Sequence, residues 1–135
     1  MTDRPPYVDE HSIGLAVPAE AAHAAVRTEV DRLLARWGSS PLTRVLGTTP
    51  RAGFELAEDD PPRLVSLAGQ HRFSRYVLDF RVEPAGSGSL ITAVTYAQFP
   101  GPRGAVYRTL VIGSRGHVLA VRRMLAGIRR RAEAG

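Results

Sequence analysis

The chain contains no cysteine, which excludes disulfide bonds, thiolate nucleophiles and cysteine-bound zinc. It contains no lysine either, since all 18 of its positively charged side chains are arginines. A Schiff-base lysine and the lysine of a phosphate-binding loop are therefore excluded as well. No apolar run approaches the roughly 20 residues of a membrane-spanning helix. Residues 1–6 lack the apolar stretch of a signal peptide, so we expect a cytoplasmic protein.

The length and composition of the chain fit one globular domain. Hydrophobic residues make up 44% of the 135 residues and charged residues 23%, values close to globular averages. We expect residues 1–6, which include two prolines, to form a loose tail, and residues 7–135 to form a single domain. The formal net charge is +5. Several of the arginines lie close together near the C-terminus: Arg122, Arg123, Arg129, Arg130 and Arg131.

Apolar periodicity predicts a strand and then a helix at the start of the chain. Apolar and polar or small residues alternate over Val8–Val17, which predicts a strand. After Pro18, apolar residues recur at spacings of three and four, which predicts a helix with one apolar stripe. Its members are Ala22, Val26, Val30, Leu33 and Trp37. The segment Gly38–Pro41 is expected to end this helix.

The middle of the chain has the pattern of β-structure. It predicts strands over residues 43–49, 53–57, 63–70, 72–82 and 90–99. Residues 58–62 read as an acidic turn and residues 84–88 as a hairpin loop. In the strand 72–82, alternation places one set of side chains on a common face: Tyr76, Leu78, Phe80 and Val82. Both faces of the strand 90–99 are mixed, so its buried face is not predicted.

The segment Phe99–Pro102 ends the β pattern, and a second helical pattern follows it. Its apolar stripe runs to the C-terminus: Val106, Leu110, Val118, Val121, Leu125 and Ile128. Gly113 and Gly116 interrupt the stripe, and each costs about 1 kcal/mol relative to alanine inside a helix. We therefore expect a long helix or two half-helices, with a kink or short break at residues 113–116. Helices at one side of an antiparallel sheet give an α+β fold.

Several segments resemble a known superfamily. Val8–Glu20 reads as a strand, a small-residue and proline turn and the start of a helix, and a final helix follows the hairpin region. In this order the chain resembles the START-like helix-grip superfamily, also called SRPBCC, which includes polyketide cyclase/dehydrase-like proteins and plant allergen-like carriers. His23 departs from the tryptophan that is frequent there. Gly69–Tyr76 and Phe99–Gly101 are similar to segments of actinobacterial members.

This resemblance implies a specific architecture. Members usually have seven strands, and the sequence itself indicates six. We expect a curved antiparallel sheet of six to seven strands wrapped around a long C-terminal helix. The resemblance also implies a cavity for a hydrophobic ligand between the sheet and that helix. It does not imply a reaction, because carriers, sensors and enzymes share this fold.

The segment Gln70–Tyr76 is the richest in polar side chains. Strand alternation places Arg72, Ser74 and Tyr76 on one face. If that face is concave, Arg72 is suited to holding a ligand carboxylate or enolate, and Tyr76 to donating a hydrogen bond. Alternatively, Arg72 lies at the strand end in water or pairs with a glutamate, and Tyr76 is a core residue with a satisfied hydroxyl.

The four histidines do not form a metal-ligand motif. His11, His23, His71 and His117 are not paired at a spacing typical of a zinc site, and we expect no metal and no cofactor. His117 follows a glycine at the expected helix break. A histidine facing a cavity is suited to acid–base chemistry near neutral pH. We prefer the simpler interpretation of a cap or surface residue.

The arginines at residues 129–131 have three interpretations. They stabilise a helix C-terminus, they bind nucleic acid, or they contact an anionic membrane surface. The first is preferred, because no nucleic-acid module is present and the apolar face of the helix is needed for the sheet. We therefore expect no specific nucleic-acid partner.

Together these observations predict a domain that binds a hydrophobic or amphipathic small molecule between sheet and C-terminal helix. The candidate pocket residues are Trp37, Phe54, Arg72, Phe73, Tyr76, Phe80, Tyr96, Tyr107 and His117. One alternative is a polyketide cyclase, aromatase or dehydratase-type enzyme, whose chemistry would need several of the same polar groups. A second is an accessory protein that binds an anionic partner through its arginine-rich C-terminal helix. The sequence leaves the catalytic residues unassigned and is compatible with a homodimer.

Overall fold

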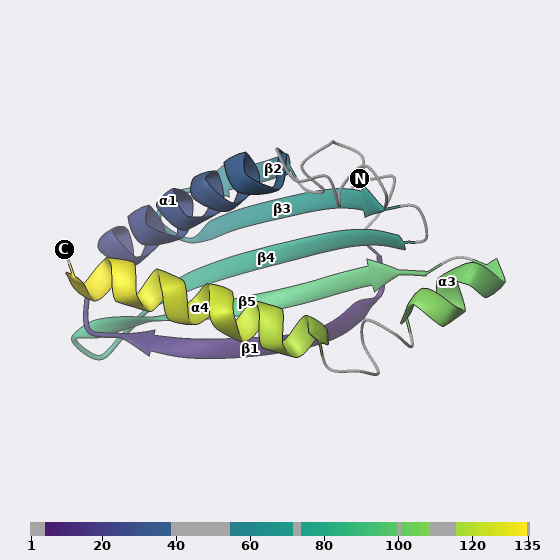
Figure 1. The fold of residues 1–135 in the computed structure, drawn as a ribbon. Coiled ribbons are helices and arrows are strands. Elements are labelled where there is room, and N and C mark those ends of the chain that lie inside the picture. Colours follow the sequence, from purple (N-terminus) through teal and green to yellow (C-terminus); the bar gives the residue numbers. More distant parts are fainter. Residues whose placement is uncertain (1–4, 39–54, 72–73, 100, 109–115, 135) are drawn as a thin grey trace.

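The protein consists of one antiparallel sheet with two helices packed side by side on one face (Figure 1). The computed structural model describes residues 5–38, 55–71, 74–99, 101–108 and 116–134. The elements are β1 (Tyr7–Leu15), α1 (Ala19–Gly38), β2 (Glu55–Asp60), β3 (Leu64–His71), β4 (Ser74–Ala85), β5 (Gly88–Gln98), α3 (Gly101–Arg108) and α4 (Gly116–Ala134). The strand order is β1-β5-β4-β3-β2, with every neighbouring pair antiparallel. The α+β class is confirmed.

The number of strands differs from the prediction. The sheet has five strands in the part of the chain that the structure describes, so the prediction of six to seven is wrong there. The expected strand 43–49 lies outside the described residues. The predicted acidic turn is also wrong, because Glu58–Asp60 forms the end of β2 and the chain reverses only at Pro61–Pro62. Asp59 is held in the strand because it meets His23 of α1, with 2.7 Å between Oδ1 and Nε2.

The first helix begins and packs as its sequence pattern predicts. Pro18 precedes it, and the amide of Ala22 donates to the carbonyl of Pro18 at 3.0 Å, closing the first turn. Ala22, Val26 and Val30 lie on one stripe and are buried. These short and β-branched side chains let α1 lie close against the sheet.

Strand register assigns each residue of the sheet to one of two faces. Val65, Phe80 and Ala93 are paired neighbours on β3, β4 and β5, and all three are fully buried under the helices. They form one apolar cluster with residues of α1 and α4, among them Val26 and Leu125. We call this the helix-facing side and the opposite one the outward side. The register also shows which face of β5 lies under the helices. The residues on that face are Ile91, Ala93, Thr95 and Ala97.

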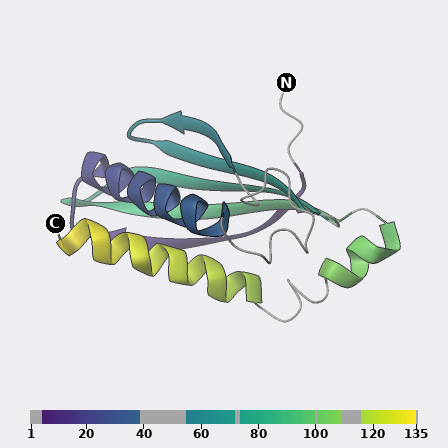
Figure 2. The ribbon, with the colours of Figure 1, turned by 45° about the horizontal axis from the view of Figure 1, so that its top comes forward.

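The C-terminal pattern contains two helices, α3 and α4, which corresponds to the expected half-helices. Most of the expected break lies outside the described residues, and Gly116 begins α4. Val121, Leu125 and Ile128 of α4 are buried in the core. Figure 2 shows α4 alongside α1, and α3 beyond the ends of the strands. In the described part of the chain, no helix has the length and apolar character needed to cross a membrane.

Candidate functional site

Small residues surround a tyrosine at one end of the helix-facing side. Across β3, β4 and β5, the register aligns Gly69, Tyr76 and Ala97 in one row. The two flanking residues have almost no side chain, so neighbouring side chains of the sheet do not crowd the Tyr76 ring from β3 or β5. Tyr76 itself is 8% exposed, and its ring meets the edge of the Phe99 ring with 5.7 Å between centroids.

The ring of Phe99 also contacts the following helix. The guanidinium carbon of Arg108, on α3, lies 5.7 Å from the centre of the Phe99 ring, a cation–π contact. Tyr76, Phe99 and Arg108 therefore form a continuous series of contacts from β4 to α3. This series borders the row of small residues.

A buried hydroxyl without a partner lies next to this row. Thr95 of β5 is 1% exposed, and within the described chain its Oγ1 has no hydrogen-bond partner. Its register neighbours are Leu78 on β4 and Asp9 on β1, so its side chain lies on the helix-facing side. Leaving a buried hydroxyl unsatisfied costs about 1–3 kcal/mol. Native proteins usually satisfy such groups, frequently with water or a bound molecule.

A histidine and an aspartate lie on β1 on the same side. Nε2 of His11 is 3.2 Å from Oδ2 of Asp9, and both side chains are only partly exposed. His11 is the register neighbour of Ala93, and Asp9 is the neighbour of Thr95. The helix-facing side therefore changes from apolar, near Val82 and Ile91, to mixed polar and small, near Thr95. Apolar walls with a few oriented polar groups are typical of a small-molecule pocket.

The outward side of the sheet carries a separate polar cluster. Asp79 is fully buried there and accepts a hydrogen bond from Oγ of Ser66 at 2.6 Å. Nη2 of Arg81 donates to the hydroxyl of Tyr96 at 2.9 Å. Along the strands, Arg81 and Tyr96 lie on either side of the Asp79–Val94 pair, so the hydrogen bond between them crosses over that pair. This contact explains how a carboxylate on the outward side is shielded from water.

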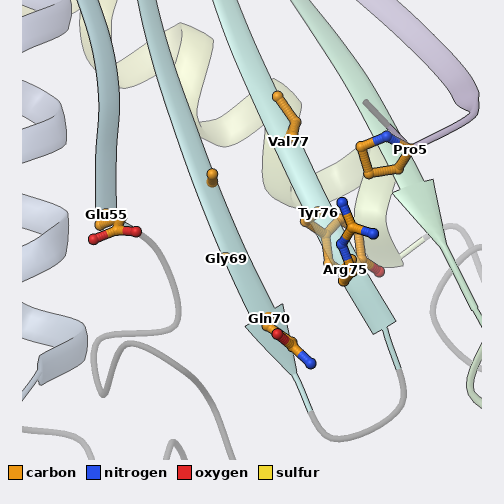
Figure 3. A pocket seen from close by; sticks show the side chains of 8 residues that line it. Pro5, Glu55, Gly69, Gln70, Arg75, Tyr76 and Val77 are labelled. Atoms are coloured by element: carbon orange, nitrogen blue, oxygen red, sulfur yellow. The ribbon is translucent and has the colours of Figure 1, made fainter. Parts of the chain in front are cut away.

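A hollow on the outward side is shown in Figure 3, where the strands lie in front of α4. Its volume is about 340 Å³, and its lining includes Glu55, Gln70, Arg75 and Val77. The charged side chains at its rim are exposed. This hollow has both polar and apolar lining, and it does not correspond to the predicted pocket between sheet and helix.

The structure places some of the predicted pocket residues and not others. Tyr76 and Phe80 lie on the helix-facing side, with Phe80 fully buried in the core. Tyr96 lies on the outward side, bonded to Arg81. Phe54, Arg72 and Phe73 lie outside the described residues. Trp37, Tyr107 and His117 lie in α1, α3 and α4, but their side chains are not among those described.

Sequence reasoning missed the role of Thr95 and the Asp9–His11 pair. Threonine is common in strands, so Thr95 gave no signal of its own. The pair is detectable in principle, because residues two apart on a strand share a face. No group of three or more histidine, aspartate or glutamate residues within the described ranges is arranged to hold a metal ion.

Comparisons with known proteins show the fold. No protein-family model matches the chain, and no curated protein does. TTHA0849 from Thermus thermophilus is 13% identical, with a TM-score of 0.54, over 96% of this chain and 98% of that chain. CalU16 from Micromonospora echinospora is 17% identical, with a TM-score of 0.50, over 93% of this chain and 83% of that chain. The chain is thus similar in fold to these two proteins.

Proposed function

We propose that the protein binds a hydrophobic or amphipathic small molecule between the helix-facing side of the sheet and α4. The observation that carries this proposal is the buried hydroxyl of Thr95, which has no partner within the described chain. It lies beside a row of small residues, Gly69 and Ala97, that flank Tyr76. A ligand with an apolar body and one polar group would fill the space and satisfy the hydroxyl.

The enzymatic alternative finds less support. A cyclase or dehydratase-type reaction needs several polar groups around one substrate. Two of the polar candidates, Tyr76 and Tyr96, lie on opposite sides of the sheet. They cannot act on the same bound molecule, so the binding function is the better supported of the two.

The proposal is tested by titration with 1-anilinonaphthalene-8-sulfonate, followed by displacement with 1-decanol. We expect saturation near one probe per chain and displacement by the alcohol. Thr95→Val keeps the shape of the side chain and removes the hydroxyl. A neutral hydrogen bond contributes about 0.5–1.5 kcal/mol, so this variant should bind 1-decanol up to about tenfold more weakly.

The matched control is Thr92→Val on the same strand. Thr92 lies on the outward side, where its hydroxyl meets that of Ser12 at 2.9 Å. This variant should bind 1-decanol like the unmodified protein. Absence of saturable probe binding, or equal losses in both variants, would contradict the proposal and indicate a filled core.

A further inference from the structure

A groove between α1 and α4 lies apart from the helix-facing side of the sheet. It has a volume of about 540 Å³, and its described lining residues all lie on the two helices. The lining residues recur at helical spacing on each helix: Glu29, Arg32, Leu33 and Arg36 on α1, and Ala120, Arg123, Met124, Ala126 and Arg130 on α4. An adjoining hollow of about 450 Å³ shares several of these residues and extends the groove to Arg131. Figures 1 and 2 both show these helices side by side. We call this the α1–α4 groove.

The α1–α4 groove is strongly basic. Its lining and extension contain the arginines at positions 32, 36, 123, 130 and 131 and a single carboxylate, that of Glu29. Glu29 is 4% exposed, and its Oε1 lies 2.8 Å from Nε of Arg32 and 3.7 Å from Nη2 of Arg131. This carboxylate is therefore already occupied by two of the arginines. For Arg123 and Arg130, the described groove lining supplies no further carboxylate.

Two arginines of α4 are available to a ligand. Arg123 and Arg130 are exposed, and they make no ion pair with the residues that the structure describes. Nη2 of Arg130 lies 3.8 Å from the position that a Cβ would take at Gly127. A Cβ at that position would collide with the carboxylate of Glu29. The absence of a side chain at Gly127 thus leaves room for the buried Glu29 carboxylate between the two helices.

The floor of the groove also has apolar surface. Leu33 and Met124 are half-buried between the arginines, and Ala120 and Ala126 add no polar atoms. Guanidinium groups bind phosphate in a bidentate way and remain charged at all physiological pH values. Among the lining residues that the structure describes, no aromatic side chain is placed for stacking on a nucleobase. The combination matches a small molecule with one phosphate and a short apolar body.

We propose that the α1–α4 groove is a binding site for a soluble, amphipathic phosphate monoester. The phosphate is held by Arg123 and Arg130, with Arg32 on the opposite wall, and the apolar part covers Leu33 and Met124. Arginines on both walls of a groove surround a single phosphate, whereas docking on a bilayer needs them on one outward face. This site does not depend on the ligand proposed between sheet and α4.

Isothermal titration with hexyl phosphate tests the proposal. We expect saturable binding of one molecule per chain, tighter than that of inorganic phosphate, because the apolar floor contributes. The double variant Arg123→Gln with Arg130→Gln should weaken binding at least tenfold. Both side chains are exposed, so the thermal midpoint should stay unchanged and show that the variant is folded.

Arg122→Gln is the matched control. Arg122 is adjacent in sequence, but it lies beside β1, next to His11 and Ile13. The Arg122→Gln variant should bind hexyl phosphate with an affinity within about twofold of that of the unmodified protein, and so should the Thr95→Val variant. Three results would overturn the proposal: no saturable binding of hexyl phosphate, an equal loss in Arg122→Gln, or binding only to vesicles of phosphatidylcholine with phosphatidylglycerol. Equal affinities for inorganic and hexyl phosphate would also count against it, since the apolar floor would then contribute nothing.

Discussion

At the scale of single residues, the close approach of β1 and the β4–β5 hairpin depends on Gly88. Gly88 begins β5 opposite Ala85, and a Cβ built on it would overlap the carbonyl oxygen of Leu15. Backbone atoms cannot rotate away as a flexible side chain does. The hydroxyl of Ser89 reinforces the same junction by donating to the carbonyl of Val17 at 2.8 Å. This corner therefore joins the hairpin to the connection between β1 and α1.

Gly88→Ala should therefore destabilise the protein. Overpacking of this kind typically lowers the free energy of unfolding by about 1–3 kcal/mol. Gly14→Ala is the control, since nothing lies within 4 Å of a Cβ at Gly14 on β1. Urea unfolding followed by circular dichroism compares the two. If Gly14→Ala lost as much stability as Gly88→Ala, the carbonyl of Leu15 would not be the cause.

At the scale of elements, the accuracy of the sequence prediction follows how each element is buried. The helix α1 and the strand β4 were predicted well, because the apolar residues of each keep a clear period on one face. Strand β5 lies between β1 and β4, and its apolar residue Val94 is buried on the outward side beneath the Arg81–Tyr96 contact. A strand buried on both sides loses its alternation. Its buried face could therefore not be predicted from sequence.

The error at β2 has a different cause. Glu58–Asp60 has the composition of a solvated turn, and no local signal indicates a strand. In the structure, Asp59 contacts Nε2 of His23 and Nη1 of Arg27, at 2.7 and 3.2 Å. These partners lie on α1, far away in sequence, and they compensate the carboxylate. Long-range contacts of this kind override local propensity. The same limit applies to the candidate site, where Tyr76 was found by alternation but the orphan hydroxyl of Thr95 was not.

The end of α4 is attached to the end of β1 by a carboxylate. Oε2 of Glu133 accepts a hydrogen bond from the amide of Ala16 at 2.9 Å, and Oε1 accepts one from Nε of Arg129 at 3.3 Å. The amide of Ala16, and then Arg129, lower the pKa of Glu133 below its ordinary value of 4.5. A lowered pKa means that the folded protein favours the charged form. The contribution to stability is thus present above pH 4.5 and is lost as the pH falls through the lowered pKa.

Glu133→Gln should accordingly lower the thermal midpoint at neutral pH. The difference from the unmodified protein should shrink as the pH falls through the lowered pKa of Glu133, since below it both side chains are uncharged. Glu83→Gln makes the same change of charge at an exposed residue of β4 that has no ion pair with the described residues. Its midpoint should follow that of the unmodified protein at both pH values. A Glu133→Gln difference that did not change with pH would show that the charge of Glu133 is not involved.

At the scale of the whole molecule, a single apolar cluster connects the sheet to both helices. It contains Leu15 at the end of β1, Val26 of α1, Phe80 of β4 and Ile128 of α4. None of these elements can bury its apolar face without the others. Loss of packing at α4 should therefore destabilise the sheet and α1 as well, and unfolding should be one cooperative transition.

Ile128→Ala tests this cooperativity. Ile128 is 0% exposed, and its truncation should cost about 2–5 kcal/mol by lost burial and the cavity left behind. Leu119→Ala on the same helix is the control, since Leu119 is 52% exposed and its truncation leaves the core intact. Circular dichroism reports the backbone, and the fluorescence of Trp37, the only tryptophan of the chain, reports α1. In Ile128→Ala both signals should move together to lower denaturant concentration, because α4 shares its core with α1 and the sheet. If α4 packed as an independent unit, the tryptophan transition would stay in place while the backbone signal divided into two steps.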